Sequence, residues 1–257
     1  MSQAFKDIRL AGDEEVGRIT LDRPPLNVLN IAMMEEIQRA LDYCRQKPHL
    51  KAVVFDANGK AFSAGVDVEE HRGEAVKRML DVFHGIFRQV VAIGRPTVAV
   101  VQGAALGGGC ELAAFCDFVI ASERAKFGQP EIKVGVFPPV AAAIFPRLVG
   151  SRRAADLILR GETIDAQEAL QIGLVNEVVS PEELEGARDR LLASLREKSG
   201  AVLGLAKRAL TLGEGTAFGP GLESIEDLYL AALMKTEDAE EGLRAFLEKR
   251  RPAWKDR

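Results

Sequence analysis

Two glutamates in this 257-residue chain stand in surroundings that are unusual for a charged side chain. Glu111 follows three consecutive glycines within AALGGGCELAAFCD, and Glu131 follows a proline within KFGQPEIKVG. Burying a carboxylate among apolar side chains is costly unless other groups offset its lost hydration. Acidic residues also favour the first turn of a helix, which is the structural alternative for Glu111. If the two meet in one cavity, they can act as acid and base.

Two turns of small residues offer backbone N–H groups to the same chemistry. The glycines at 107–109 permit a tight turn from a strand into a helix. A helix that begins there points unpaired N–H groups and the positive end of its dipole at one spot. A second turn, KAFSAGVD (60–67), follows the strand-like segment KAVVFDA. Two carboxylates and two N–H-rich turns are the parts needed for a reaction at a carbonyl group.

The elements that must position these groups alternate between strands and helices, which indicates an α/β class. Residues rich in β-branched side chains predict strands at 15–24, 51–57, 96–103, 118–122 and 126–129. Apolar residues at helical spacing predict helices after Asn30, which is placed to cap, and over 74–91, 108–116, 152–160 and 165–172. The remainder, 181–257, is mostly helical and charged.

Composition excludes several classes of protein. The chain is 47% hydrophobic and 28% charged with a net charge of −4, and it lacks the massed basic residues of a nucleic-acid binder. Its three cysteines lack paired spacing and predict small buried thiols in a reducing compartment. The three histidines show no metal-ligand spacing. No signal pattern or membrane-length apolar run is present, so we expect a cytoplasmic protein without a membrane partner.

Three motifs together resemble the crotonase (enoyl-CoA hydratase/isomerase) superfamily. They are FSAGVD, GAALGGGCELAAFCD and KFGQPEIKVGV, in this order and spacing, and the likeness runs from ITLDRP to AFLEKRRPAWKD. The resemblance implies a spiral of ββα units followed by a C-terminal helical region that builds trimers, often paired into hexamers. We accordingly expect residues 1–200 to form the core with the catalytic site, and residues 201–257 to form the oligomerisation region.

The resemblance also implies roles for individual residues. The carbonyl of a coenzyme A thioester would lie between the backbone N–H groups of Ala64 and Gly108. Water would be oriented and deprotonated by Glu111, and Glu131 would deliver a proton to the α-carbon. Coenzyme A enters as part of the substrate, with no separate cofactor and no metal. The residues implied in binding it are Ala64, Gly65, Val66, Asp67, Val68 and Lys249, although Lys249 also fits a solvated helix face.

One segment departs from the common hydratase pattern. FPPVAAAIFPRLVG (137–150) stands where fatty-acid hydratases have a glycine-rich loop beside the acyl pocket. The resemblance therefore implies a stiffer, differently shaped pocket, with Phe137, Pro138 and Val140 in its wall. This segment, RPPLNVLN, AGVDVEEH and the C-terminal stretch are similar to cyclohexa-1,5-dienecarbonyl-CoA hydratases of anaerobic benzoyl-CoA degradation. We expect hydration of that ring dienoyl thioester, with a general short-chain enoyl-CoA hydratase as the alternative.

Other activities remain open at this stage. A Δ3,Δ2-enoyl-CoA isomerase often needs only the acid matching Glu131, and dienoyl-CoA isomerases use a further acid where this chain has Pro139. Ser63, Asp67 and His71 could form the catalytic triad of a serine hydrolase, but the GxSxG motif that positions such a serine is absent. His71 fits either the mouth of the acyl site or the surface. A relative that only binds coenzyme A or RNA is the non-enzymatic alternative, and the near-neutral charge disfavours RNA.

Overall fold

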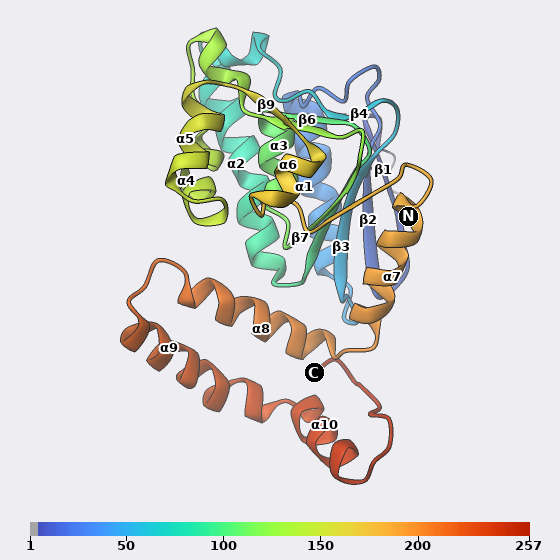
Figure 1. Ribbon diagram of the computed structural model, residues 1–257. Coiled ribbons are helices and arrows are strands. Elements are labelled where there is room, and N and C mark those ends of the chain that lie inside the picture. Colours follow the sequence, from blue (N-terminus) through green and yellow to red (C-terminus); the bar gives the residue numbers. More distant parts are fainter. Residues whose placement is uncertain (1–4) are drawn as a thin grey trace.

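Two β-sheets form the core of the computed structural model, which describes residues 5–257 (Figure 1). The larger sheet has six strands in the order β1-β2-β3-β5-β7-β10, and the smaller has four in the order β4-β6-β8-β9. Pairing is parallel except between β1 and β2 and between β8 and β9. The strands are β1 (Ile8–Gly12), β2 (Val16–Leu21), β3 (Ala52–Ala57), β4 (Ala61–Ser63), β5 (Thr97–Val101), β6 (Ala104–Leu106), β7 (Phe118–Ser122), β8 (Lys126–Gly128), β9 (Thr163–Asp165) and β10 (Glu177–Val179).

The central strands of the larger sheet are apolar on both faces because helices cover both sides. Along β3, Val53 and Phe55 face the main core, whereas Val54 belongs to a second cluster on the opposite face. The second cluster is closed by Leu184 and Leu192 of α7. The helices around the sheets are α1 (Ile31–Arg45), α2 (Ala75–Ile93), α3 (Gly108–Ala114), α4 (Pro139–Leu148), α5 (Ser151–Leu159), α6 (Ala166–Gln171) and α7 (Leu184–Arg196).

Local sequence signals position the elements that carry the candidate site. The Asn30 side chain caps α1 by accepting a hydrogen bond from Met33 N, as predicted. Two 3-10 turns, η1 (Glu69–His71) and η2 (Pro130–Val134), follow β4 and β8 respectively. The α3 helix starts directly after β6, across the tight turn at Gly107. Both turns of small residues therefore lie beside strand ends of the smaller sheet.

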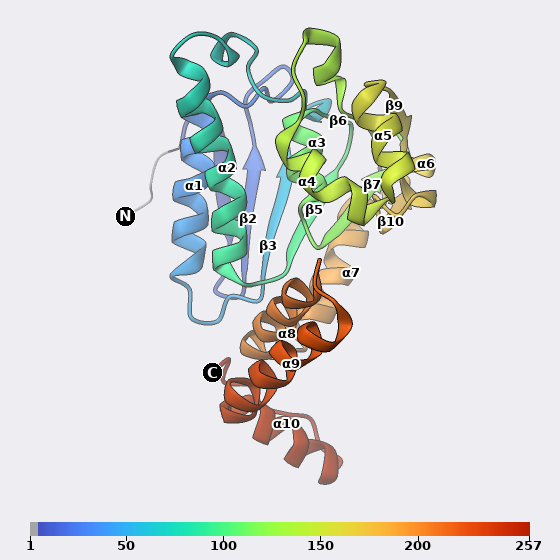
Figure 2. The ribbon, with the colours of Figure 1, turned by 90° about the vertical axis from the view of Figure 1, so that its left-hand side faces the viewer.

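A helical arm extends from the core at the C-terminal end (Figures 1 and 2). It consists of α8 (Gly200–Gly213), α9 (Phe218–Ala231), the 3-10 turn η3 (Leu233–Lys235) and α10 (Glu237–Leu247). The last residues return to its base, where Trp254 Nε1 donates to the Glu197 carbonyl at 2.7 Å and Asp256 accepts from Gly200 N at 2.7 Å. The expected division after residue 200 falls at the start of α8, and it stays a prediction of domain organisation.

The structure corrects one expectation about an element. Most of the segment 137–150, expected as a stiff loop, is the helix α4. Pro139 stands in its first turn, where the missing N–H removes no helical hydrogen bond. Ala141 and Phe145, four residues apart, are both fully buried and hold the helix on the core. The strands β1, β4, β6, β9 and β10 were also not anticipated, and all but β1 are three residues long.

Across residues 5–257, no helix combines the length and the apolar character that a membrane crossing requires. The same residues contain no cluster of three or more histidine, cysteine, aspartate or glutamate side chains suited to a metal ion. Cys44, Cys110 and Cys116 are buried free thiols, as predicted. The cytoplasmic location stays an expectation from the sequence.

Candidate active site

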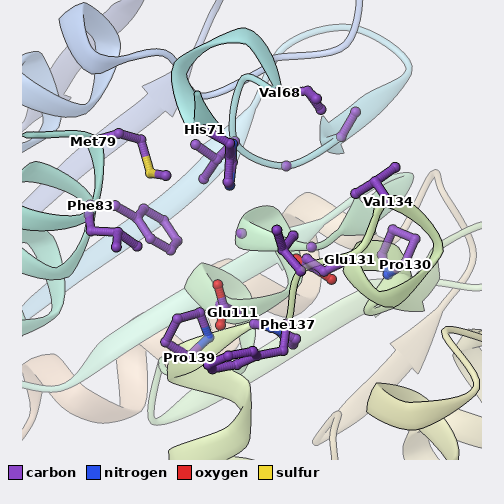
Figure 3. A pocket seen from close by; sticks show the side chains of 18 of the residues that line it. Val68, His71, Met79, Phe83, Glu111, Pro130, Glu131, Val134, Phe137 and Pro139 are labelled. Atoms are coloured by element: carbon purple, nitrogen blue, oxygen red, sulfur yellow. The ribbon is translucent and has the colours of Figure 1, made fainter. Parts of the chain in front are cut away.

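A cavity of about 420 Å³ collects most of the residues singled out in the sequence (Figure 3). One wall comes from the segment after β4 and from α2, and the other comes from α3, η2 and the start of α4. Its lining is mainly apolar, and both glutamates reach it. The predicted site residues in its wall are Ala64, Gly65, Val66, Val68, Gly108, Glu111, Glu131, Phe137 and Pro138.

Glu111 lies in the first turn of α3 and is only 2% exposed. Its Oε1 accepts a hydrogen bond of 2.7 Å from the Ala141 backbone N–H at the start of α4. Burial raises the pKa of Glu111 to about 7; the Ala141 hydrogen bond opposes this rise, and the charge of Glu131 adds to it. A carboxylate that titrates near neutrality can exchange protons in either direction during a reaction.

Glu131 lies in η2, partly buried, and its carboxylate reaches the turn at the start of α3. A Cβ atom at position 107 would lie 2.5 Å from Glu131 Oε1, and Gly107 has a φ of +52°, so both space and conformation require glycine there. Burial raises the pKa of Glu131 as well. The side-chain amide of the buried Gln129, which sequence reasoning missed, donates to both carboxylate oxygens at 3.2 and 3.3 Å when its nitrogen faces them.

Two backbone N–H groups without a hydrogen-bond partner among the described residues belong to Gly108 and Val66. Val66 forms a parallel bridge with Leu29. In this bridge Leu29 N donates to the Gly65 carbonyl and the Leu29 carbonyl accepts from Asp67 N, so the Val66 N–H takes no part in it. Ala64, the donor expected from the sequence, already donates to the Leu26 carbonyl at 3.0 Å. Val66 therefore replaces Ala64 as the candidate donor, although Ala64 remains in the cavity wall.

Val66 and Gly108 are close neighbours across the cavity floor. A Cβ atom at position 108 would lie 2.6 Å from Val66 Cγ2, so no side chain fits there without displacing a wall. A Cβ atom at position 65 would lie only 3.6 Å from Gly108 N, so the two chain segments lie close together at this point. Two neighbouring, unpartnered N–H groups in a largely apolar cavity can stabilise a negatively charged oxygen. Beside them, the two carboxylates can move protons.

Three predicted residues lie outside this cavity. Val140 is absent from its wall and packs partly buried against the main core. Asp67 instead anchors its own turn, donating through N to the Leu29 carbonyl and accepting from Glu69 N through Oδ1. Lys249 follows the end of α10 on the arm, where it is exposed. By contrast, His71 reaches the cavity, which decides between its two expected locations.

The hydrolase alternative does not assemble in the structure. The Ser63 hydroxyl donates to the Asn27 carbonyl at 2.7 Å and accepts from Gly65 N, and Ser63 is not in the cavity wall. His71 Nδ1 pairs with the Asp67 backbone carbonyl rather than with its carboxylate.

Pro139 lines the cavity at the position where a dienoyl-CoA isomerase would need an acid.

Comparison with known proteins agrees with this geometry. The model of the family described as "Enoyl-CoA hydratase/isomerase" matches residues 11–257. The chain belongs to the enoyl-CoA hydratase/isomerase family. Its α/β architecture follows a crystal structure of an enoyl-CoA hydratase from Bacillus anthracis, with a TM-score of 0.91 and 33% sequence identity over 98% of this chain and 100% of that one. The predicted crotonase-type fold is thereby confirmed.

Curated members of the enoyl-CoA hydratase/isomerase family are similar over nearly the full chain. A cyclohexa-1,5-dienecarbonyl-CoA hydratase from Thauera aromatica is 38% identical and covers 100% of both chains. A crotonyl-CoA hydratase from Syntrophomonas wolfei is 35% identical and covers 96% of this chain and 97% of its own length.

Proposed function

We propose that this chain is a hydro-lyase that adds water to the conjugated double bond of an enoyl-CoA thioester. The main observation that supports this activity is that two carboxylates, Glu111 and Glu131, share one largely apolar cavity with two N–H groups that have no hydrogen-bond partner among the described residues. Burial raises the pKa of both carboxyl groups, which suits an acid–base pair. Membership of the enoyl-CoA hydratase/isomerase family and relatives named as hydratases support the same activity.

In the proposed mechanism, the thioester oxygen accepts hydrogen bonds from Val66 N–H and Gly108 N–H, which stabilise the enolate as it forms. Glu111, ionised, removes a proton from water while the water oxygen bonds to the substrate carbon that becomes hydroxylated. The double-bond electrons move toward the thioester, and Glu131, protonated, supplies the proton that the carbon skeleton takes up. The pair carries one proton before and after turnover, so transfer of a proton from Glu111 to Glu131 restores it.

We propose cyclohexa-1,5-diene-1-carbonyl-CoA as the substrate, which the enzyme would hydrate during benzoyl-CoA degradation. The support is the 38% identity to the Thauera aromatica hydratase and a cavity wall built from Phe137, Pro138 and Pro139 instead of a flexible glycine loop. Coenzyme A would arrive with the substrate, and no separate cofactor takes part in the proposed steps. The contact of Lys249 with coenzyme A stays a prediction.

The experiment gives the purified protein cyclohexa-1,5-diene-1-carbonyl-CoA and crotonyl-CoA in parallel and follows addition of one water by mass spectrometry. We expect hydration of the ring diene with the higher kcat/KM. A preference for crotonyl-CoA would contradict the ring substrate and leave a general enoyl-CoA hydratase. Hydration of neither, with movement of the double bond in a Δ3-enoyl-CoA, would replace the hydratase by an isomerase.

We also propose that the arm joins copies of this chain into a trimer. Large apolar side chains on the arm are exposed, including Phe218 at 84%, Phe246 at 82% and Leu247 at 79%. Met234, Leu243 and Leu247 line a shallow depression on α10 and η3. Apolar surface of this kind favours a protein partner over water. In a ring of three copies, each copy places such a surface against a different surface of the next copy.

A further inference from the structure

One imidazole stands in the cavity wall that faces the glutamates, and the mechanism above does not use it. His71 points into the cavity from η1, beside Met79 and Phe83 of α2 (Figure 3). Most other side chains on that wall, including Val66 and Leu80, are apolar, and the charged exception is the adjacent Arg72. In a mostly apolar pocket, a small number of placed polar groups fix the orientation of the ligand.

The hydrogen bond at Nδ1 determines what the other nitrogen can do. His71 Nδ1 lies 2.8 Å from the Asp67 backbone carbonyl, and a carbonyl can only accept, so Nδ1 carries the proton. In the neutral imidazole, Nε2 then has a lone pair and acts as an acceptor. Nε2 has no hydrogen-bond partner among the described residues.

The turn that carries His71 is anchored at two points to the segment that leads into α1. Glu70 accepts a hydrogen bond of 2.7 Å from Ile31 N at the start of α1, and Asp67 N donates to the Leu29 carbonyl at 3.0 Å. The same Leu29 forms the bridge that orients Val66. The acceptor nitrogen and the proposed oxyanion donor therefore belong to one fixed segment, which pre-organises the acceptor relative to a bound thioester.

A hydrocarbon enoyl group has no hydrogen-bond donor to offer such an acceptor. Water addition creates one, because the product carries a hydroxyl on its acyl part. We propose that His71 Nε2 accepts a hydrogen bond from the hydroxyl of the hydroxyacyl thioester, so that His71 selects hydroxylated over unhydroxylated acyl groups. This inference rests on the proposed hydration, which supplies the hydroxylated product.

The test compares two ring thioesters of nearly equal size, 6-hydroxycyclohex-1-ene-1-carbonyl-CoA and cyclohex-1-ene-1-carbonyl-CoA. Their inhibition constants are measured from initial hydration rates for the wild type, His71→Phe and His71→Gln. We expect the wild type to prefer the hydroxylated ligand, and His71→Phe to lower that preference about fivefold, the usual size of one neutral hydrogen bond. His71→Gln keeps an acceptor oxygen and should retain part of the preference.

Two results would overturn the inference. One is an unchanged preference in His71→Phe, and the other is an equal loss of affinity for both thioesters, which would place Nε2 on the coenzyme A portion. If the wild type prefers crotonyl-CoA, 3-hydroxybutyryl-CoA and butyryl-CoA replace the ring pair. If it hydrates nothing, the same pairs are titrated calorimetrically. A His71-dependent preference there would sustain the inference while the hydration proposal fails alone.

Discussion

At the scale of single residues, the chemistry of the site depends on how strongly burial raises the pKa of the two carboxyl groups. Glu111 is held by one backbone N–H in apolar surroundings, whereas Glu131 is held by the Gln129 amide at the edge of the same cavity. Neither has a basic side chain as a hydrogen-bond or ion-pair partner among the described residues. Burial therefore dominates over attraction, and it raises the pKa of both groups.

The raised pKa of Glu111 predicts a stability effect with a definite sign. The folded state retains a proton up to about pH 7, whereas the unfolded carboxyl loses it near 4.5, so stability falls as pH rises between these values. Glu111→Gln has no proton to lose, so it avoids this fall in stability, and its side-chain oxygen can still accept the hydrogen bond from Ala141 N–H. We expect its Tm to exceed that of the wild type by at least about 4 °C at pH 8 and to match it near pH 4.

Thermal unfolding at the two pH values checks this expectation, with the exposed Glu14→Gln as the control that should leave Tm unchanged. A Glu111→Gln variant that is no more stable than the wild type at pH 8 would show that burial does not raise this pKa.

At the scale of elements, the junction between β6 and α3 is the most constrained part of the site. Gly108→Ala would place a methyl group 2.6 Å from Val66 Cγ2 and 3.0 Å from Phe83 Cζ, against the side chain of the other proposed donor residue. We expect kcat for hydration to fall by about 100-fold or more, as when one such donor is lost. The matched control is Gly186→Ala in α7, where the nearest atom is 3.7 Å away.

Steady-state kinetics and circular dichroism distinguish the outcomes for Gly108→Ala. A folded variant with nearly normal kcat would mean that the thioester oxygen is not bound between Gly108 and Val66. The Gly186→Ala control should keep kcat and gain a little stability, because alanine favours a helix over glycine.

The elements also show how far the sequence alone could lead. Strands and helices with strong patterns, such as the segment at 51–57 and the helix capped by Asn30, were predicted because their signals are local. Both glutamates were found because isolated acids in apolar segments are visible in the sequence. The Val66 donor was missed because the bridge to Leu29 that orients it is a contact between distant segments.

The α4 helix was mistaken for a loop because its segment stands where fatty-acid hydratases have a glycine-rich loop. Pro139 at the helix start and buried residues four apart, Ala141 and Phe145, were the available signals for a helix. The roles of Gln129 and the Ala141 N–H could not be assigned because they depend on where the folded chain places the two carboxylates.

At the scale of the whole molecule, the helical arm projects away from the core (Figure 2). The core carries the cavity, and the arm carries exposed apolar side chains. We expect the wild type to be a trimer, and Phe246→Glu to shift it toward monomers, because a charge would be buried between copies. Size-exclusion chromatography with light scattering measures the mass, and Glu14→Lys on the core surface serves as the control. A monomeric wild type, or a Phe246→Glu variant with unchanged mass, would contradict the proposed role of this face.

The measurement that tests the central claim most directly is the hydration rate of Glu111→Gln beside its affinity for an unreactive acyl-CoA. Glutamine preserves shape and removes proton transfer, so we predict a kcat at least about 100-fold below the wild type, with a Kd for butyryl-CoA within about threefold. Glu131→Gln should behave in the same way. A Glu111→Gln enzyme that hydrates its substrate within a few-fold of the wild-type rate would contradict the two-carboxylate account.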